Sequence, residues 1–412
     1  METKLADFIK YTPEGAEAES ILRKCVHCGF CTATCPTYQL LGDELDGPRG
    51  RIYLIKQVLE GTAATAKTQL HLDRCLTCRS CETTCPSGVQ YGRLLDIGRE
   101  VVEKQVGRGA FASLQRAALR KVIPNASLFG PLLKLGQLVR PLLPVALKQK
   151  VPASTPAAKP WPQQQHARRM LVLEGCAQPS LAPATNAATA RVLDRLGITL
   201  VRAREAGCCG AVSFHLNAQD EALAAMRRNI DAWWPHLEGG AEKIVITASG
   251  CGVMVKDYAH ALMHDTAYAE KAKRASELAC DVSDVIIAEQ AALKTRLTPH
   301  ASRLTQKIAF HAPCTLQHGL KKKGAVETLL TELGFTLTPV VDAHLCCGSS
   351  GTYSILQPEL SRQLRDNKIA ALEQGAPQAI LTANIGCQSH LQSATSLPVR
   401  HWIEALDDLL AS

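Results

Sequence analysis

Aromatic side chains are scarce in this sequence, since phenylalanine, tryptophan and tyrosine together make up 4% of the residues. Proteins that bind single-stranded nucleic acids stack bases on aromatic rings, so this composition argues against that class of protein. Long apolar runs are also missing, because no stretch approaches the roughly 18 apolar residues of a membrane-spanning helix. The first 20 residues have no apolar core and include five acidic ones, which is unlike a secretory signal, so we expect a cytoplasmic protein.

Acidic residues are absent from one long segment. Residues 104–173 contain 12 Lys/Arg and no Asp/Glu, so the excess behind the formal net charge of +8 lies entirely within them. Basic, partly apolar helices bind anionic lipid surfaces, which predicts a peripheral contact with the inner face of the cytoplasmic membrane. A solvated helical linker that packs its apolar side on the preceding domain is an equally supported interpretation. The segment carries no nucleic-acid-binding motif, so we expect no nucleic acid partner.

Cysteine, in contrast, is abundant, with 17 residues. In a reducing cytosol such a number indicates metal or redox chemistry rather than disulfides. Two blocks share the spacing C-x2-C-x2-C-x3-C-P: CVHCGFCTATCP at residues 25–36 and CLTCRSCETTCP at residues 75–86. Four thiolates bind one [4Fe–4S] cluster, and in two-cluster ferredoxins the fourth comes from the other block. The predicted ligands are Cys25, Cys28, Cys31 and Cys85 for one cluster, and Cys75, Cys78, Cys81 and Cys35 for the other.

A pair of zinc sites is the alternative for these blocks. Zinc takes four ligands from two C-x2-C pairs and does not need a third cysteine at the same spacing. The repeated triplet therefore favours two iron–sulfur clusters, each of which transfers one electron at a time.

The C-terminal part of the chain repeats itself. Three cysteine landmarks recur at offsets of 138, 138 and 136 residues, and short apolar runs alternate with helical patterns in each copy. This alternation predicts parallel βαβ units, with each cysteine group just past the carboxyl end of a strand, where open α/β sheets bind ligands. The cysteines are candidates for further cluster ligands or redox thiols, although buried cysteines often serve packing alone. They are Cys176, Cys208, Cys209 and Cys251 in the first copy, and Cys314, Cys346, Cys347 and Cys387 in the second.

Three further residues stand near these landmarks. Cys280 has no counterpart in the second copy, so we expect an ordinary core cysteine. His311 and His344 precede cysteines by three and two residues, and could bind or tune a cluster. A structural role, or a hydrogen bond to a ligand, is the commoner one for such histidines.

We therefore predict a multidomain chain with a two-cluster domain at residues 1–103. A basic helical segment with a Pro/Ala/Gln linker follows at residues 104–169, and two α/β cysteine-rich domains occupy residues 170–298 and 299–412. The long, apparently helical gap between the two cysteine blocks resembles the α-helical ferredoxin domain in iron–sulfur subunits of membrane-linked dehydrogenases.

No glycine-rich dinucleotide fingerprint, P-loop or nucleophile elbow is present in the sequence. We assign no catalytic residue to this chain. Oxidation of an alcohol or hydroxy acid removes two electrons, whereas a cluster transfers one, so a flavin-bearing partner is needed to divide the pair.

The stretches GCCGAVSF and LCCGSSGTYS resemble the CCG domain of heterodisulfide reductase, of anaerobic glycerol-3-phosphate dehydrogenase and of lactate-oxidising complexes. That family's motif has five cysteines and ends in C-x2-C. Ala248 and Asn384 stand here where the penultimate cysteine would be, so each copy keeps four thiols. Additional clusters in these domains are therefore an expectation from the resemblance alone.

Taken with the two ferredoxin blocks, the order of motifs along nearly the whole chain resembles the iron–sulfur subunits of glycolate oxidase (glycolate dehydrogenase). The resemblance implies a complex with two FAD-linked subunits that oxidises glycolate to glyoxylate, and also D-lactate, and passes electrons towards a membrane or quinone-linked acceptor. This chain would be the electron-transfer subunit, with no FAD of its own. The alternatives are the iron–sulfur subunit of a lactate or glycerol-3-phosphate dehydrogenase, or a thiol/disulfide enzyme like heterodisulfide reductase.

Overall fold

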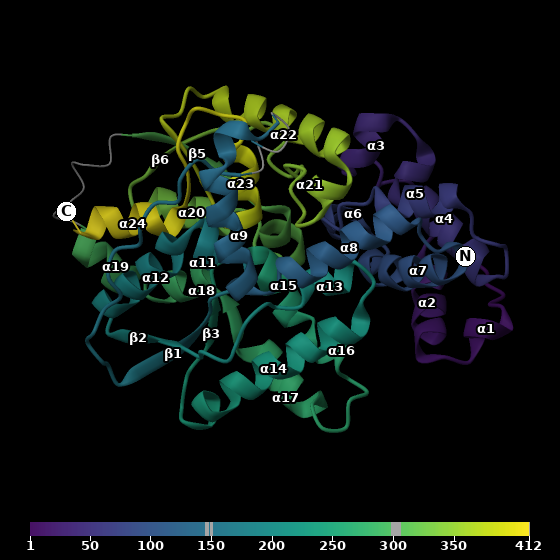
Figure 1. The fold of residues 1–412 in the computed structure, drawn as a ribbon, viewed down its shortest axis with the longest axis horizontal. Coiled ribbons are helices and arrows are strands. Elements are labelled where there is room, and N and C mark those ends of the chain that lie inside the picture. Colours follow the sequence, from purple (N-terminus) through teal and green to yellow (C-terminus); the bar gives the residue numbers. More distant parts are fainter. Residues whose placement is uncertain (145–147, 149–150, 298–305, 412) are drawn as a thin grey trace. The chain divides into compact units, whose positions relative to one another are not determined.

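The computed structural model describes residues 1–144, 148, 151–297 and 306–411 (Figure 1). These residues form two compact units. The predicted boundary between the cysteine-rich domains, at residues 298 and 299, lies outside the described residues, and the four-part division of the chain stays a prediction. The first unit comprises Met1–Ala117, His215–Asn217 and His344–Lys368, and the second comprises Ala118–Phe214, Ala218–Ala343 and Ile369–Ser412.

The first unit is helical throughout its described regular elements. Three of its helices begin with proline, whose fixed φ suits the first helical position and whose missing N–H costs nothing there. The elements are α1 (Asp7–Lys10), α2 (Pro13–Lys24), α3 (Pro36–Leu41), η1 (Glu44–Asp46), α4 (Pro48–Leu59), α5 (Ala66–Asp73), α6 (Ser80–Thr84), α7 (Tyr91–Val106) and α21 (Tyr353–Leu356). The predicted α-helical ferredoxin-like domain is therefore confirmed.

The core of this unit lies between α2, α4, α5 and α7. A methyl group on Gly98 would lie 2.6 Å from the Ile55 side chain, so only glycine allows α7 to approach α4 this closely. Leu22, Leu94 and Leu95 are fully buried in the same cluster, which also includes cysteines of both blocks. The cysteine loops therefore rest directly on a packed apolar core.

The second unit contains two four-stranded parallel sheets (Figure 1). Their strand orders, β2-β1-β3-β4 and β6-β5-β7-β8, are equivalent, which confirms the internal duplication and the parallel βαβ units. The first sheet consists of β1 (Arg168–Leu173), β2 (Ile198–Arg202), β3 (Ile244–Ile246) and β4 (Ala279–Asp281); the second consists of β5 (Lys307–His311), β6 (Thr336–Thr338), β7 (Ala379–Thr382) and β8 (Val399–His401).

The last strand of each sheet was not predicted from the sequence. β4 and β8 each have three residues, Ala-Cys-Asp and Val-Arg-His, and neither forms an apolar run. Each is recognisable as a strand only because it pairs with a neighbouring strand, β3 or β7.

Helices connect and cover the strands of the second unit. Those preceding or within the first copy are α9 (Ala126–Leu138), η2 (Arg140–Leu142), α11 (Gln178–Leu181), α12 (Pro183–Arg195), α13 (Ala211–His215), α14 (Gln219–Glu238), α15 (Ser249–Lys256), α16 (Tyr258–Ala261), α17 (Ala269–Leu278), α18 (Val282–Ala288) and α19 (Gln290–Leu297). The second copy has η4 (Thr315–Gly319), α20 (Ala325–Glu332), α22 (Pro358–Glu373), α23 (Ile385–Gln392) and α24 (Trp402–Ala411), while α8 (Ala110–Val122) follows the ferredoxin-like domain.

The two copies share one hydrophobic core. It joins Ile198 and Val245 of the first copy to Phe310 and Trp402 of the second. Helix α12 packs against α24, where the Arg191 guanidinium forms a 2.6 Å ion pair with Asp407. In the described part of the chain, no helix has both the length and the apolarity needed to cross a bilayer.

Candidate functional site

The two ferredoxin-type blocks fold into loops of the same backbone shape. In each loop the second residue after the first cysteine is left-handed, with φ of 55° at His27 and 52° at Thr77. Two residues further on, Gly29 and Arg79 are left-handed as well, with φ of 84° and 59°. Left-handed conformations are costly for residues with side chains and persist at functional sites where surrounding contacts require them. The repeated spacing thus produces two cysteine loops of equivalent backbone conformation.

The first group of thiols surrounds a hollow at the end of α2. Cys25, Cys28, Cys31 and Cys85 line it, together with apolar side chains that include Ile52. Burial, together with the neighbouring Cys25, Cys28 and Cys85, raises the pKa of the Cys31 thiol to about 11. Four thiolates brought together this closely repel one another, so a cationic iron cluster, which needs four thiolates, matches this donor set.

The second group of thiols, Cys35, Cys75, Cys78 and Cys81, is more deeply buried than the first. Cys35, Cys75 and Cys81 are buried, whereas Cys78 is partly exposed. Burial raises the pKa of Cys81 well above its ordinary value, and the neighbouring Cys78, Cys75 and Cys35 raise it further. Cys35 therefore adjoins the second block, just as Cys85 adjoins the first. These neighbours are the ones that the crossed pairing requires, and the pairing itself stays a prediction.

A buried ion network lies beneath the second group. Asp46, fully buried, accepts from the Arg51 guanidinium at 3.3 Å and from Arg74 at 2.8 Å. Arg51 also donates to Thr37, whose hydroxyl lies 3.3 Å from the Cys35 sulfur. Cys75 and Cys35 are among the negative groups that raise the pKa of Arg51 against the opposing effect of burial. The network thus places a permanent positive charge beside the predicted cluster ligands.

Asp43, Asp46 and His71 also place ligand atoms within 4.8 Å of one another. The Asp46 carboxylate is already engaged by two guanidinium groups and by His71 at 3.2 Å. A metal ion there would have to compete with the Arg51 and Arg74 guanidinium groups, so we interpret the group as structural.

The first cysteine-rich copy brings its four thiols near one another. The pKa of Cys208 is influenced by Cys176 and Cys209, and that of Cys209 by Cys208 and Cys251. The thiols of Cys176 and Cys209, the backbone N–H of Gly210 at 3.5 Å and the charge of Arg228 hold the pKa of Cys208 well below its ordinary value. Three separate segments thus bring thiols together, as the repeat predicts.

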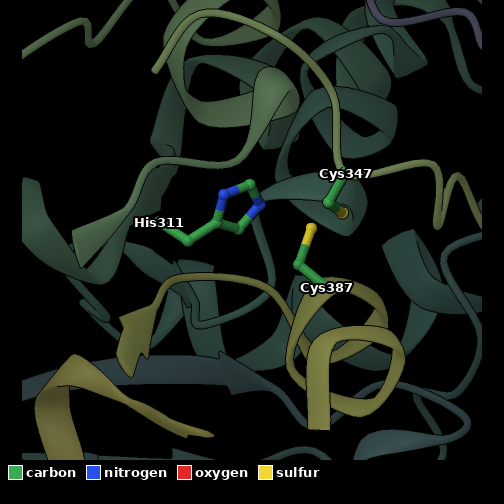
Figure 2. A group of neighbouring side chains, drawn as sticks. All are labelled: His311, Cys347 and Cys387. Atoms are coloured by element: carbon green, nitrogen blue, oxygen red, sulfur yellow. The ribbon is translucent and has the colours of Figure 1, made fainter. Parts of the chain in front are cut away.

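The second copy differs from the first in its donor atoms. Figure 2 shows the side chains of His311, Cys347 and Cys387, whose ligand atoms all lie within 4.8 Å of one another. His311 ends β5 and corresponds by the 138-residue offset to the apolar Leu173 in the first copy. The second copy therefore offers a mixed imidazole and thiol site, whereas the first offers thiols alone.

Asn384, which stands in place of the family's penultimate cysteine, contacts both copies. Its side-chain amide donates to the Cys387 sulfur at 3.5 Å, and its carbonyl oxygen accepts from the Gly250 N–H at 3.4 Å. Cys251 and Cys387 lie in the first turns of α15 and α23, just past the carboxyl ends of β3 and β7. A helix begins immediately at the carboxyl end of each strand, so the strand-to-helix junction itself presents the thiol.

Cys280 lies apart from these groups on β4. It packs against the shared core, and burial raises the pKa of its thiol to about 12. This placement is consistent with a packing role.

The basic segment, residues 104–173, has fewer unpaired positive charges than its composition indicates. Several of its cations pair with carboxylates elsewhere in the chain, such as Arg108 with Asp73 at 2.7 Å. The cations that form ion pairs are Lys104, Arg108, Arg116, Arg120, Lys159 and Arg168. Local absence of acid along the sequence therefore does not make the whole segment a basic surface.

Known proteins resemble this chain in its separate domains and along its full length. Residues 21–89 match the family described as a 4Fe-4S dicluster domain, and residues 170–256 and 308–392 match the CCG family, described as a cysteine-rich domain. The chain is 60% identical over 410 residues to the glycolate oxidase iron-sulfur subunit of Escherichia coli (strain K12), a match that covers 100% of this chain and 99% of that protein.

Two relatives match with lower identity, one along most of the chain and one along about half of it. The probable glycolate oxidase iron-sulfur subunit of Bacillus subtilis (strain 168) is 29% identical over 400 residues, covering 90% of this chain and 88% of that protein. Lactate utilization protein A of Bacillus licheniformis is 29% identical over 201 residues, covering 48% of this chain and 80% of that protein.

Proposed function

Because the chain belongs to the family of glycolate oxidase iron–sulfur subunits, we propose that it carries electrons from a flavoprotein that oxidises glycolate to glyoxylate. The single observation that supports this most is the 60% identity to the Escherichia coli subunit along essentially the whole of both chains. We extend the proposal to D-lactate as a second substrate of the complex and to a membrane-linked quinone as the acceptor. The chain is an oxidoreductase component, and the substrate chemistry belongs to its partners.

Two [4Fe–4S] clusters are proposed as the cofactors, held by the two crossed groups of cysteines. When bound, each cluster takes up and releases one electron at a time. The chain's own residues shield the sulfurs from water and balance their charge. Cys35, Cys75 and Cys81 are each less than 10% exposed, and Arg51 is buried beside them. The second cysteine group is thus the better protected of the two.

The first cysteine group is proposed as the side that meets the flavoprotein, which is a pair of FAD-linked subunits. Cys28 is exposed, and the flanking Val26 and Phe30 are 68% and 60% exposed. Exposed apolar residues around a redox ligand are suited to a partner interface, because docking buries them and excludes water from the site.

Anaerobic mixing of separately purified components tests this function. The full chain alone is expected to show a [4Fe–4S] EPR signal after chemical reduction and to oxidise no glycolate. Glycolate added to the chain together with the FAD-linked subunits is expected to bleach the visible absorbance of the clusters, because electrons then reach them through the flavin. Glycolate turnover by the pure chain, free of flavoprotein, would falsify the proposal.

A thiol/disulfide enzyme is the alternative that the repeated cysteines raise. The lowered pKa of Cys208 favours thiolate chemistry. However, Cys208 and Cys209 are 1% and 3% exposed, which leaves a disulfide substrate little access to them. We therefore favour electron transfer, with these thiols as candidates for a further cluster. Lactate or glycerol-3-phosphate as the substrate remains the alternative within electron-transfer complexes, and the flavoprotein partner would decide it.

Helix α9 and the following η2 are proposed as the peripheral membrane contact on the inner face of the cytoplasmic membrane. Leucines recur there at helical spacing, and Leu135 and Leu138 are 55% and 78% exposed. The exposed Lys121 and Lys134 add positive charge near this apolar face. Insertion of leucine side chains together with attraction of lysines to anionic headgroups is the usual basis of interfacial helix binding. The exposed leucines are Leu128, Leu132, Leu135, Leu138 and Leu142.

Glutamate at both Leu135 and Leu138 is expected to lower sedimentation of the chain with anionic phospholipid vesicles by at least about 100-fold, since burying each leucine contributes about 1.5–3 kcal/mol. The matched control is Met263→Glu, because Met263 is 53% exposed on the first cysteine-rich copy and lies outside this surface. Equal binding of the double variant and the control would show that the α9 leucines do not touch lipid.

A further inference from the structure

Two side chains from the second cysteine-rich copy donate hydrogen bonds to the Cys75 loop within the first unit. The Ser350 hydroxyl donates to the carbonyl oxygen of Leu76 at 2.7 Å, and the Tyr353 hydroxyl donates to that of Arg74 at 3.2 Å. Both residues follow the Cys346-Cys347-Gly348 motif by a few positions, although more than 270 residues separate them from the loop they contact. The Arg74–Cys75 and Leu76–Thr77 peptide groups are therefore held by a distant part of the chain.

The contact made by Ser350 continues to the sulfur of Cys75. The carbonyl of Leu76 and the N–H of Thr77 belong to one peptide group, and that N–H donates to the Cys75 sulfur at 3.4 Å. A peptide whose carbonyl accepts a hydrogen bond becomes a stronger donor through its N–H. The Ser350 hydroxyl thus strengthens a hydrogen bond to a predicted cluster ligand without touching that ligand.

The Cys25 loop has different surroundings at the position that corresponds to Leu76. There Cys25 and His27 correspond to Cys75 and Thr77. The residue in between, Val26, has a side chain that is 68% exposed, whereas the Leu76 side chain is 3% exposed. Two loops of the same backbone shape are therefore placed in different environments, one open to water and one buried and hydrogen-bonded from outside.

Ser350 itself is held in an unusual conformation. Its φ of 34° lies in the left-handed region, which a residue with a side chain enters at a cost. Glycine would adopt this conformation freely, yet the chain has a serine here, and its hydroxyl makes the contact with Leu76. The hydroxyl group accounts for a non-glycine residue at this position.

We propose that Ser350 is a positioning residue that raises the reduction potential of the cluster held by Cys75 above that of the cluster held by Cys25. Hydrogen bonds to cluster sulfurs stabilise the more negative, reduced state, and are one of the ways in which proteins set cluster potentials. The inference rests on the proposed function, since it requires both clusters. It assigns to the second cysteine-rich copy a direct influence on the ferredoxin-like domain.

Ser350→Gly tests the proposal, because glycine removes the hydroxyl and tolerates the positive φ. Redox titration of the full chain, followed by EPR, is expected to show a shift to lower potential for the Cys75 cluster and no shift for the Cys25 cluster. Ser350→Ala is expected to give the same shift, which separates loss of the hydroxyl from relief of backbone strain. Iron content equal to that of the unaltered chain shows that each variant folds and holds its clusters.

Tyr353→Phe is the matched comparison. It also removes one hydroxyl hydrogen bond to the loop, but the Arg74 carbonyl belongs to a peptide whose N–H donates to the Leu72 carbonyl rather than to sulfur. We therefore expect a smaller shift than for Ser350→Gly. Unchanged potentials in the fully loaded Ser350 variants, or equal shifts of both clusters, would overturn the inference. Absence of any cluster signal in the unaltered chain would instead overturn the proposed function, and the inference with it.

Discussion

Serine in place of Cys35 is expected to abolish the same EPR signal that serine in place of Cys78 abolishes, although Cys35 belongs to the other block. Each variant should lose about four of about eight iron atoms per chain, because a [4Fe–4S] cluster needs all four thiolates. Cys85→Ser should likewise reproduce Cys28→Ser. Glycolate oxidation by the assembled complex is expected to fall to background in all four variants. Iron, acid-labile sulfide and EPR of the reduced chains measure these losses.

The control for these substitutions is Cys280→Ser. It makes the same replacement of sulfur by oxygen on β4, away from both groups of predicted ligands. It should keep the iron, both signals and the activity. If Cys35→Ser instead resembled Cys28→Ser, each block would hold its own cluster and the crossed pairing would be wrong. Colourless, zinc-containing protein would refute iron–sulfur clusters altogether. More than about eight iron atoms in the unaltered chain would indicate that the cysteine-rich copies bind clusters as well.

Asparagine in place of Asp46 is expected to destabilise the ferredoxin-like domain by about 3–5 kcal/mol, the usual cost of leaving a buried charge without its partner. Arg51 is 1% exposed and would lose its carboxylate, while the size of the side chain at position 46 hardly changes. The measurement is the temperature at which the cluster absorbance disappears on anaerobic heating. Loss of the signal that depends on Cys35 should come first, since Thr37 links this network to Cys35.

Asp43→Asn provides the matched control three residues earlier. Asp43 is exposed and caps η1 by accepting from the Leu45 N–H at 2.9 Å, a role that asparagine can also fill. Its effect should be small, within about 0.5 kcal/mol. Equal heat stability of the two variants would show that the buried network does not support the domain.

Much of the fold could be predicted because its signals are local. The βαβ alternation identified the first three strands of each copy, and the matched cysteine offsets identified the duplication. β4 and β8 were missed because neither forms an apolar run, whereas β3, which also has three residues, is Ile-Val-Ile. The prediction of a membrane contact relied on the positive charge of residues 104–173. The structure leaves less of that charge unpaired, because cations such as Arg108 pair with carboxylates from other segments.

The candidate site also has features that the sequence predicted and features that only the structure revealed. The thiols and their spacing predicted the ligands, whereas His311 could be named but not distinguished from an ordinary buried histidine until its ring was placed beside Cys347 and Cys387. Asn384 was noted for the cysteine it replaces. Its contacts with Cys387 and Gly250 had no signal in the sequence, because they depend on how the two copies face each other.

By itself, the sequence determined which chemistry this protein can support: eight thiols in two loops of one spacing, followed by a duplicated α/β half with four thiols in each copy. The spacing of ligands along a short loop is a covalent property, so it can be read without a fold. Only the tertiary structure decided which thiols adjoin, which charges are buried beneath them and which hydroxyl reaches the Cys75 loop. Those features arise between residues far apart in the chain, where burial and hydrogen bonding depend on packing and leave no local pattern.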